Sequence, residues 1–421
     1  MAQSTEILTK AELTWKESAK DVIADLRELA SLTSDKDGAH RVAWTPVWDK
    51  AQEWFKAKMK AEGAEIIVDS ANSVWAKIEG ETDEAVVIGS HLDCVPNGGW
   101  LDGALGVVSG MGALKRYGKN GKKPKKTLYI VSWADEEGAR FGRSCIGSSA
   151  VSGALDIDEA AKLKDNDGVS FLEAIGRYNL DIKDFPKARE EFLARNIKSY
   201  LEIHIEQAPV LESQGKSVAC VYGITGCERQ YITFTGQPAH SGSPIYMRRD
   251  AFLAAAQASL AFREIAKKYE AYCTVGKVKV EPDIVTIFPG KCTISLDQRC
   301  IDGDTLKKMY QEAIDACHTA AKDNNVEVEF ESVWSIPPTI FDEHLAELCK
   351  DAVKEETGER TSMYSGPLHD AAEIAKFVPS IMMFAMSTNG LSHCKEEDTP
   401  DKDLELAIAA FLRMTEKVVN E

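Results

Sequence analysis

The pattern of apolar and polar positions predicts alternating helices and strands in the first half of the chain. Residues 15–34 and 45–62 place apolar side chains at helical spacing and are predicted as amphipathic helices. Two apolar runs follow, EAVVIGSHLDCVPNGG and KKTLYIVSWADEEGARFG, separated by a helix-like stretch over 104–117. This order of strand, helix and strand predicts a mostly parallel sheet, with the ligand site beyond the carboxyl ends of its strands.

The second half predicts an inserted domain. Just before the insert, apolar and polar residues alternate in the run SYLEIHIEQAP, which places Glu202, His204 and Glu206 on one face of a strand.

From about residue 219 the order of elements becomes strand, helix, strand, strand, helix, strand, which is typical of a small α/β sandwich. We therefore expect an α/β fold in which a mostly parallel-sheet catalytic domain, 1–218 and 333–421, is interrupted by a smaller α/β sandwich at 219–332.

Length and charge narrow the class of protein. A chain of 421 residues exceeds the usual size of one domain, and its formal net charge of −17 argues against nucleic acid or an anionic membrane as a partner. The first residues lack a basic stretch followed by an apolar one, and no segment approaches about 20 apolar residues. Ten scattered cysteines without a C-x-x-C pair favour reduced thiols. We expect a cytoplasmic protein.

Acidic residues and a histidine follow the two predicted strands. His91 and Asp93 share a face of an extended segment, so the carboxylate can hold the imidazole or bind a metal beside it. Asp102 lies in a glycine-rich loop, and the run 135–137 places three acids where mutual repulsion disfavours a dry pocket without a cation. A structural histidine, a helix cap and a solvated acidic loop are the alternatives.

Several motifs between residues 89 and 397 resemble those of the M20-type hydantoinase/carbamoylase amidases, in family order. They are GSHLDCVPNGGWLDGALGV, ADEEGARFG, LEIHIEQAPVLE, AHSGSPIYMRRDA, SGPLHDA and NGLSHCKEE. That group includes N-carbamoyl-L-amino acid hydrolases, β-ureidopropionases and allantoate amidohydrolases. The resemblance implies a two-metal enzyme that hydrolyses a C–N bond in a small N-carbamoyl or N-acyl compound. Nitrogen and oxygen ligands suit Zn²⁺, with Mn²⁺, Co²⁺ or Ni²⁺ as alternatives.

The resemblance also implies roles for residues of the catalytic domain. One metal would be held by His91 and His204 and the other by Glu137 and His393, with Asp102 bridging them. Asp93 would orient His91, and Glu136 would be the general base. Gln207, beside His204, would contact the carbamoyl or amide group of the substrate.

Further roles fall on the inserted sandwich, which resembles the family's lid and dimerisation domain. His240 would stabilise the oxyanion across the interface of a homodimer, with a surface histidine as the alternative. Arg299 would clamp a substrate carboxylate, and a salt bridge to Asp297 on the same strand face is the competing interpretation.

Some positions depart from the family pattern. Thr286 stands where the family has an asparagine that helps to bind the substrate carboxylate, Ala208 replaces a glycine, and Pro367 and Leu368 replace a small pair. Substrate and stereospecificity therefore stay open. A peptidase or aminoacylase of the wider metallopeptidase clan and an allantoate-type ureido hydrolase are alternative functions. A non-catalytic scaffold would lack a ligand or the base, and none is missing.

Overall fold

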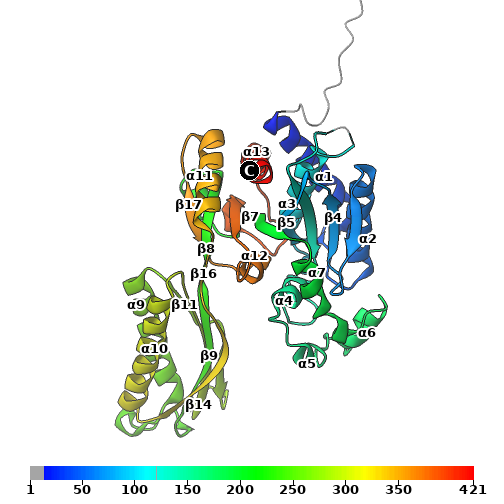
Figure 1. Cartoon of the computed structure of the whole chain (residues 1–421). Coiled ribbons are helices and arrows are strands. Elements are labelled where there is room, and N and C mark those ends of the chain that lie inside the picture. Colours follow the sequence, from blue (N-terminus) through cyan, green and yellow to red (C-terminus); the bar gives the residue numbers. More distant parts are fainter. Residues whose placement is uncertain (1–13, 120) are drawn as a thin grey trace, which may run out of the picture. The chain divides into compact units, whose positions relative to one another are not determined.

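A computed structural model describes residues 14–119 and 121–421. The chain forms two compact units, one comprising the chain up to Tyr222 together with Phe341–Glu421, and the other comprising Gly223–Ile340 (Figure 1). The inserted unit thus starts and ends a few residues later than the expected 219 and 332. A β-bulge between Ser332 and Trp334 interrupts the last strand, which nevertheless continues to Ile336. The expectation about the amino-terminal residues falls largely on 1–13, outside the described residues.

The larger unit is built on a mixed sheet whose four central strands are parallel. These are β18 (Ser380–Ala385), β7 (Ile197–Ile205), β5 (Thr82–His91) and β6 (Lys126–Trp133). Antiparallel strands flank them: β4 (Val74–Ile78) and β3 (Glu65–Val68) beyond β6, and β8 (Val218–Ile224) beyond β18, with β16 (Thr339–Ile340) and β17 (Ser362–Ser365) on β8. The expected mostly parallel central sheet is confirmed.

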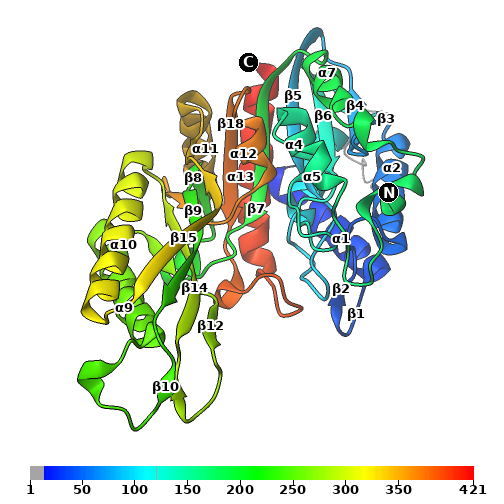
Figure 2. The ribbon, with the colours of Figure 1, turned by 90° about the horizontal axis from the view of Figure 1, so that it is seen from below.

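Helices cover both faces of the central strands. One group comprises α1 (Trp15–Thr33), α3 (Ala104–Lys115), α11 (Glu343–Thr357) and α13 (Asp401–Asn420), and another comprises α4 (Ile146–Ser152), α7 (Lys187–Leu193) and α12 (Asp370–Ile374). Figure 1 labels α3, and Figure 2 labels the others. The helix α2 (Pro46–Ala61) packs on α1, β3 and β4. None of the helices in the described part of the chain is long and apolar enough to cross a bilayer.

The alternation around His204 does not separate buried from exposed side chains. Glu202, His204 and Glu206 are as buried as the leucine and isoleucines between them. Glu202 accepts hydrogen bonds from Ser90 Oγ and Tyr200 OH, and Glu206 accepts them from two backbone N–H groups. Because a central parallel strand has both faces covered, its polar positions must find partners inside the protein.

Short elements complete the larger unit: β1 (Ser34–Asp35), β2 (Gly38–Ala39), α5 (Ile157–Ala160), α6 (Phe171–Gly176), α8 (Val210–Ser213), and the 3-10 turns η1 (Ile182–Asp184) and η3 (Thr388–Gly390).

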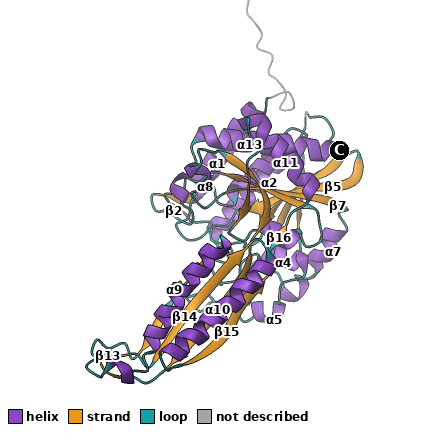
Figure 3. Ribbon diagram, turned by 90° about the vertical axis from the view of Figure 1, so that its left-hand side faces the viewer, coloured by secondary structure: helices purple, strands orange, loops and turns teal. Residues whose placement is uncertain are grey.

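The inserted unit is an antiparallel sheet with two helices on one face. Its strands are β9 (Gly226–Thr235), β14 (Lys291–Cys300), β15 (Glu327–Ile336), β11 (Tyr272–Thr274) and β12 (Val278–Glu281). Figure 3 shows α9 (Ala251–Tyr269) and α10 (Gly303–Asp323) along them. A separate ribbon joins β10 (Ala239–His240) to β13 (Ile287–Phe288), and η2 (Ile245–Met247) follows β10.

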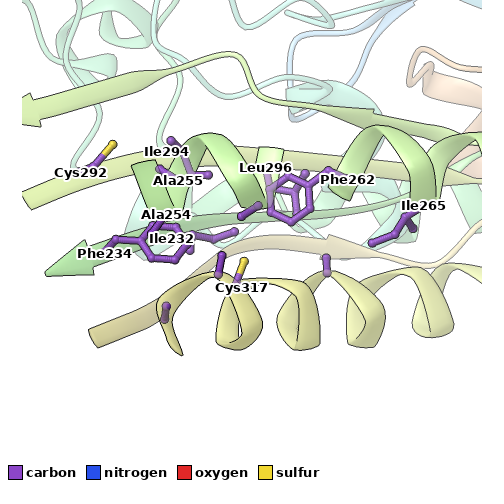
Figure 4. Close-up of a cluster of buried hydrophobic side chains, with 14 of the residues drawn as sticks. Ile232, Phe234, Ala254, Ala255, Phe262, Ile265, Cys292, Ile294, Leu296 and Cys317 are labelled. Carbon is purple, nitrogen blue, oxygen red and sulfur yellow. The ribbon is translucent and has the colours of Figure 1, made fainter. Parts of the chain in front are cut away.

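This unit has a hydrophobic core of its own. Alternate residues of β9 and β14, among them Ile232, Phe234 and Leu296, point toward α9 and α10 (Figure 4). Phe262 of α9 lies among them and is 1% exposed. Burial of one sheet face against two helices is sufficient reason for the βαββαβ segment to form a compact unit.

We expect Phe262→Ala to destabilise the inserted unit by about 3–5 kcal/mol, because it removes a buried ring and leaves a cavity. Phe252→Ala on the same helix is the control, since Phe252 is 47% exposed. Chemical denaturation followed by circular dichroism measures both variants. Equal free energies of unfolding would contradict the placement of Phe262 in this core.

Candidate metal centre

The candidate ligands follow the carboxyl ends of the parallel strands. His91 is the last residue of β5, Glu137 lies just beyond β6, and His204 lies near the end of β7. His393 comes from the loop after β18. Parallel strands end at the same edge of a sheet, which brings residues far apart in sequence together.

These residues form two donor groups that share one carboxylate. His91, Asp102 and His204 form one group, and Asp102, Glu137 and His393 form the other, with the donor atoms of each within 4.8 Å of one another. Asp102 Oδ1 lies 3.1 Å from His204 Nε2 and 3.8 Å from His91 Nε2. Asp102 Oδ2 lies 3.2 Å from His393 Nε2, which is 3.3 Å from Glu137 Oε2. The expected ligands therefore converge, with Asp102 between the groups.

The charge of this cluster fits divalent cations. Burial, with the neighbouring Asp370 and Glu137, raises the pKa of Glu136 well above its usual range, and burial with Asp102 does the same for the pKa of Glu137. Glu137 Oε1 is buried and has no hydrogen-bond partner among the described residues. Several desolvated carboxylates are stable together only when positive charge is close.

The two histidines of the first donor group have pKa values shifted in opposite directions. Although burial opposes it, the hydrogen bond to Asp102 raises the pKa of His204 to about 9, while burial lowers the pKa of His91 to about 3. Binding of a metal would replace the proton shared by His204 and Asp102, because a metal ligand must be a neutral imidazole. Nitrogen and oxygen donors suit Zn²⁺, Mn²⁺, Co²⁺ or Ni²⁺.

Asp93 connects the acidic loop that follows β5 to the acidic loop that follows β6 and carries Glu136 and Glu137. Its carboxylate accepts hydrogen bonds from the backbone N–H of Glu136, at 3.3 Å, and of Glu137, at 3.1 Å. His91 Nδ1 lies 3.1 Å from the backbone oxygen of Asp93 and 3.7 Å from its carboxylate. The orientation of His91 is thus set mainly by the Asp93 carbonyl, and the Asp93 side chain positions the Glu136–Glu137 loop.

Gln207 lies beside the shared carboxylate. Its Nε2 donates to Asp102 Oδ2 at 3.1 Å and to Ser392 Oγ at 3.1 Å. Glu397 accepts from the backbone N–H groups of Leu101 and Asp102 and from the Ser392 hydroxyl. Sequence reasoning assigned no role to Ser392 or Glu397. Their signal was the NGLSHCKEE segment itself, in which a hydroxyl and an acid flank His393.

Left-handed backbone conformations gather at the site. Asp135, Gln207 and His393 have φ values of 54°, 57° and 58°, and Gly103 has φ of 63°. Such conformations carry strain in residues other than glycine and persist where surrounding contacts impose them. At Gln207 and His393 this backbone conformation accompanies side chains that reach Asp102 Oδ2, at 3.1 Å from Gln207 Nε2 and 3.2 Å from His393 Nε2.

The remaining expected site residues lie in the inserted unit. His240 Nδ1 accepts from the Gly242 N–H at 3.0 Å, and the Thr286 carbonyl accepts from the Ser241 N–H, so these two residues belong to adjoining loops. Arg299 Nε donates to Asp297 Oδ1 at 2.8 Å. Arg229 binds the same carboxylate at 2.6 Å. The salt bridge weighed for Arg299 is therefore present.

Comparison with known proteins shows the family to which this chain belongs. Residues 87–417 match the family described as Peptidase family M20/M25/M40. The chain belongs to this family. The allantoate amidohydrolase of Bacillus subtilis is 30% identical over 416 residues, 98% of this chain and 100% of the relative.

Other members of the M20 family agree over most of their length. The N-carbamoyl-L-amino acid amidohydrolase of Geobacillus stearothermophilus is 31% identical over 370 residues, 87% of this chain and 90% of the relative. A solved hydantoinase/carbamoylase-family amidase from Burkholderia multivorans has a TM-score of 0.87 at 28% identity, and the match covers 96% of this chain and 98% of that one.

These comparisons confirm the resemblance to the hydantoinase/carbamoylase amidases within the M20 family. They also confirm the expected enzyme class, an amidohydrolase that acts on C–N bonds other than peptide bonds. The family is metal-dependent, and the two donor groups are the candidate site for the metal in this member.

Gly103 is required by the site itself. A Cβ atom at this position would lie 2.3 Å from the His91 ring. We expect Gly103→Ala to lower bound metal and kcat/KM about tenfold or more, because the ring must move. Elemental analysis and steady-state kinetics measure both quantities.

Gly215→Ala is the matched control for this variant. Gly215 has nearly the same φ, 64°, but nothing lies within 4 Å of its added Cβ. It carries the same backbone strain without the contact, so metal content and activity should be retained. Equal losses in both variants would mean that strain, and not the His91 contact, explains the glycine.

Proposed function

We propose that this enzyme hydrolyses a C–N bond of a small carboxylate-bearing N-carbamoyl or related ureido compound, using two divalent metal ions. His91 and His204 would hold one ion, and Glu137 and His393 the other, with Asp102 ligating both. The observation that carries the proposal is the shared Asp102 carboxylate, each oxygen of which faces a different donor group. Zn²⁺ and Mn²⁺ both suit these donors.

Ions held there would supply an activated water and polarise the carbonyl group that is attacked. The protein's part is to move protons. Glu136 Oε2 lies 3.6 Å from His91 Nε2, at the edge of the first donor group, and the side chain is buried. Glu136 would accept the proton of the attacking water and deliver it to the leaving nitrogen.

The substrate class is supported by the relatives and by charge. Allantoate and N-carbamoyl-L-amino acids, the substrates named for two relatives, share a carboxylate and a ureido group. In the inserted unit, the guanidinium groups of Arg299 and Arg229 both bind the Asp297 carboxylate, and a planar guanidinium suits bidentate recognition of a carboxylate. We propose that Arg299 binds the substrate carboxylate, with the Thr286 hydroxyl assisting.

Two polar side chains would complete the recognition of the substrate. Gln207, whose amide lies beside Asp102, would contact the ureido group. His240 is exposed at the end of β10 and would donate to the developing oxyanion. An aminoacylase would not need a contact to a ureido group. A panel of carbamoyl, formyl and acyl amides therefore distinguishes the two functions.

We expect Glu136→Gln to lower kcat by about a hundredfold to ten-thousandfold while metal stays bound, because the variant removes a proton acceptor and spares the ligands. Glu137→Gln is the contrasting variant and should lose metal as well as activity. Steady-state kinetics with elemental analysis separates them. Near-wild-type turnover by Glu136→Gln would show that another group is the base.

We expect Arg299→Ala to lower kcat/KM for a carboxylate substrate about tenfold to a hundredfold, since a charge-assisted pair contributes about 1.5–3 kcal/mol. The loss on the neutral amide analogue should be small. Arg229→Ala is the control, because it also removes a partner of Asp297. If both variants lose equally on charged and neutral substrates, Arg299 is structural.

We further propose a homodimer formed through the inserted unit. Several large apolar side chains of this unit are exposed in the single chain, including Leu260 of α9 at 68% and Tyr246 at 88%. Exposed apolar groups of this kind favour association. Light scattering during gel filtration should give twice the 46.2 kDa chain mass. A fully active monomer would contradict both the dimer and a His240 contribution across an interface.

A further inference from the structure

The segment His40–Thr45 supplies no ligand to the candidate metal site, yet it contacts both acidic loops of that site. It connects β2 to α2. One of its residues binds the loop Leu92–Cys94, which follows His91, and another binds Asp135, which precedes Glu136 and Glu137. We call His40–Thr45 the bracket segment.

Arg41 is the contact to the first loop. Its Nε donates to the Leu92 carbonyl at 2.9 Å. The Arg41 backbone N–H donates to the Cys94 sulfur at 3.2 Å, and the Cys94 backbone N–H donates to the Arg41 carbonyl at 3.2 Å. The guanidinium is fully buried, and its described hydrogen bonds go to neutral acceptors, Leu92 O and Thr33 Oγ1. A buried guanidinium is costly unless its N–H groups are bound, so the hydrogen bonds to Leu92 and Thr33 fix its place. Asp93 lies between its two contact residues.

Trp44 is the contact to the second loop. Its indole Nε1 donates to Asp135 Oδ2 at 2.6 Å, and both side chains are completely buried. The carbonyl of Trp44 accepts from Arg140 at 2.6 Å and from Arg177 at 3.2 Å. The ring packs on Trp48 with centroids 5.1 Å apart. Trp44 is therefore held from several sides.

Backbone strain shows that this bond matters. Trp44 and Asp135 both adopt left-handed conformations, with φ of 62° and 54°. Strained residues other than glycine persist only where their surroundings fix them, and the Trp44–Asp135 hydrogen bond is one of the contacts that fix both. The turn at Asp135 directs the N–H groups of Glu136 and Glu137 toward the Asp93 carboxylate.

We propose that Arg41 and Trp44 are positioning residues for the metal centre, which hold the His91 loop and the Glu136–Glu137 loop at their mutual spacing. Arg41 fixes the carbonyl and thiol that flank Asp93, and Trp44 fixes the turn whose backbone binds the Asp93 carboxylate. The site's geometry thus depends on a segment that contains none of its ligands. This inference rests on the proposed two-metal function.

The test measures binding of Co²⁺ to the chelator-stripped full-length enzyme. Trp44→Phe removes the indole N–H and keeps a packed ring. Trp48→Phe is the matched control, since Trp48 is equally buried in the same cluster and its Nε1 has no described hydrogen-bond partner. We expect the Co²⁺ dissociation constant of Trp44→Phe to rise about 10- to 100-fold, as when groups that orient metal ligands are lost. Its visible d–d absorption should change, whereas Trp48→Phe should match the wild type.

The thermal unfolding midpoint of the metal-free variants separates positioning from folding. Both tryptophan variants should stay folded at the temperature of the Co²⁺ titration, with a lower midpoint for Trp44→Phe because it loses a buried hydrogen bond. Co²⁺ affinity and spectrum of Trp44→Phe equal to those of Trp48→Phe would overturn the proposal. If Trp44→Phe does not fold, Arg41→Lys decides: it keeps the charge but loses the guanidinium geometry, and wild-type Co²⁺ affinity would overturn the proposal. A wild-type enzyme that binds no Co²⁺ would instead overturn the proposed function.

Discussion

The structure depends on one buried carboxylate whose two oxygens face different sets of donors. Asp102 Oδ1 meets His204, and Oδ2 meets His393 and Gln207. Removing such a group from water is unfavourable unless its charge is matched on both sides. Its backbone N–H is bound by Glu397, and its neighbour Gly103 leaves room for the His91 ring. The residues around Asp102 therefore have little freedom to move.

Rigidity of this kind comes from the central sheet. His91 and His204 lie at or near the ends of central strands, and Glu137 and His393 lie in the loops that follow two others, so all four gather at one edge of the sheet. Asp93 then joins the loop after β5 to the loop after β6 through backbone hydrogen bonds. A metal centre with donors from four strands or their loops needs such a frame, because small displacements of a ligand weaken binding.

The inserted unit has its own core around Phe262 and carries Arg299, Thr286 and His240, which we propose recognise the substrate. The larger unit carries the candidate metal ligands and Glu136. In the function we propose, the departures at Thr286 and at Pro367 and Leu368 alter substrate choice, while the metal chemistry keeps its full set of residues.

The sequence by itself determined the elements, because their periodicity is local. The helices after residues 15 and 45, the βαββαβ order of the insert and the parallel strands before His91 and Asp135 all follow from the spacing of apolar residues. The resemblance of the motifs supplied the candidate ligands, because the residue type alone shows which side chains can donate to a metal. Only tertiary structure decided which loops meet. It showed the Asp93 carboxylate on the Glu136–Glu137 backbone, the burial of Glu202 and Glu206, and the end of the insert beyond a β-bulge.

The limit of prediction from sequence is clearest for Arg41, Trp44 and Glu397. Each acts on a residue distant in sequence, 51 positions away for Arg41 and Leu92, 91 for Trp44 and Asp135, and 295 for Glu397 and Asp102. No periodicity or short motif encodes a partner at such a separation. These contacts exist because the sheet brings its strand ends to one edge, so the physical reason for each residue appears only once the chain is folded.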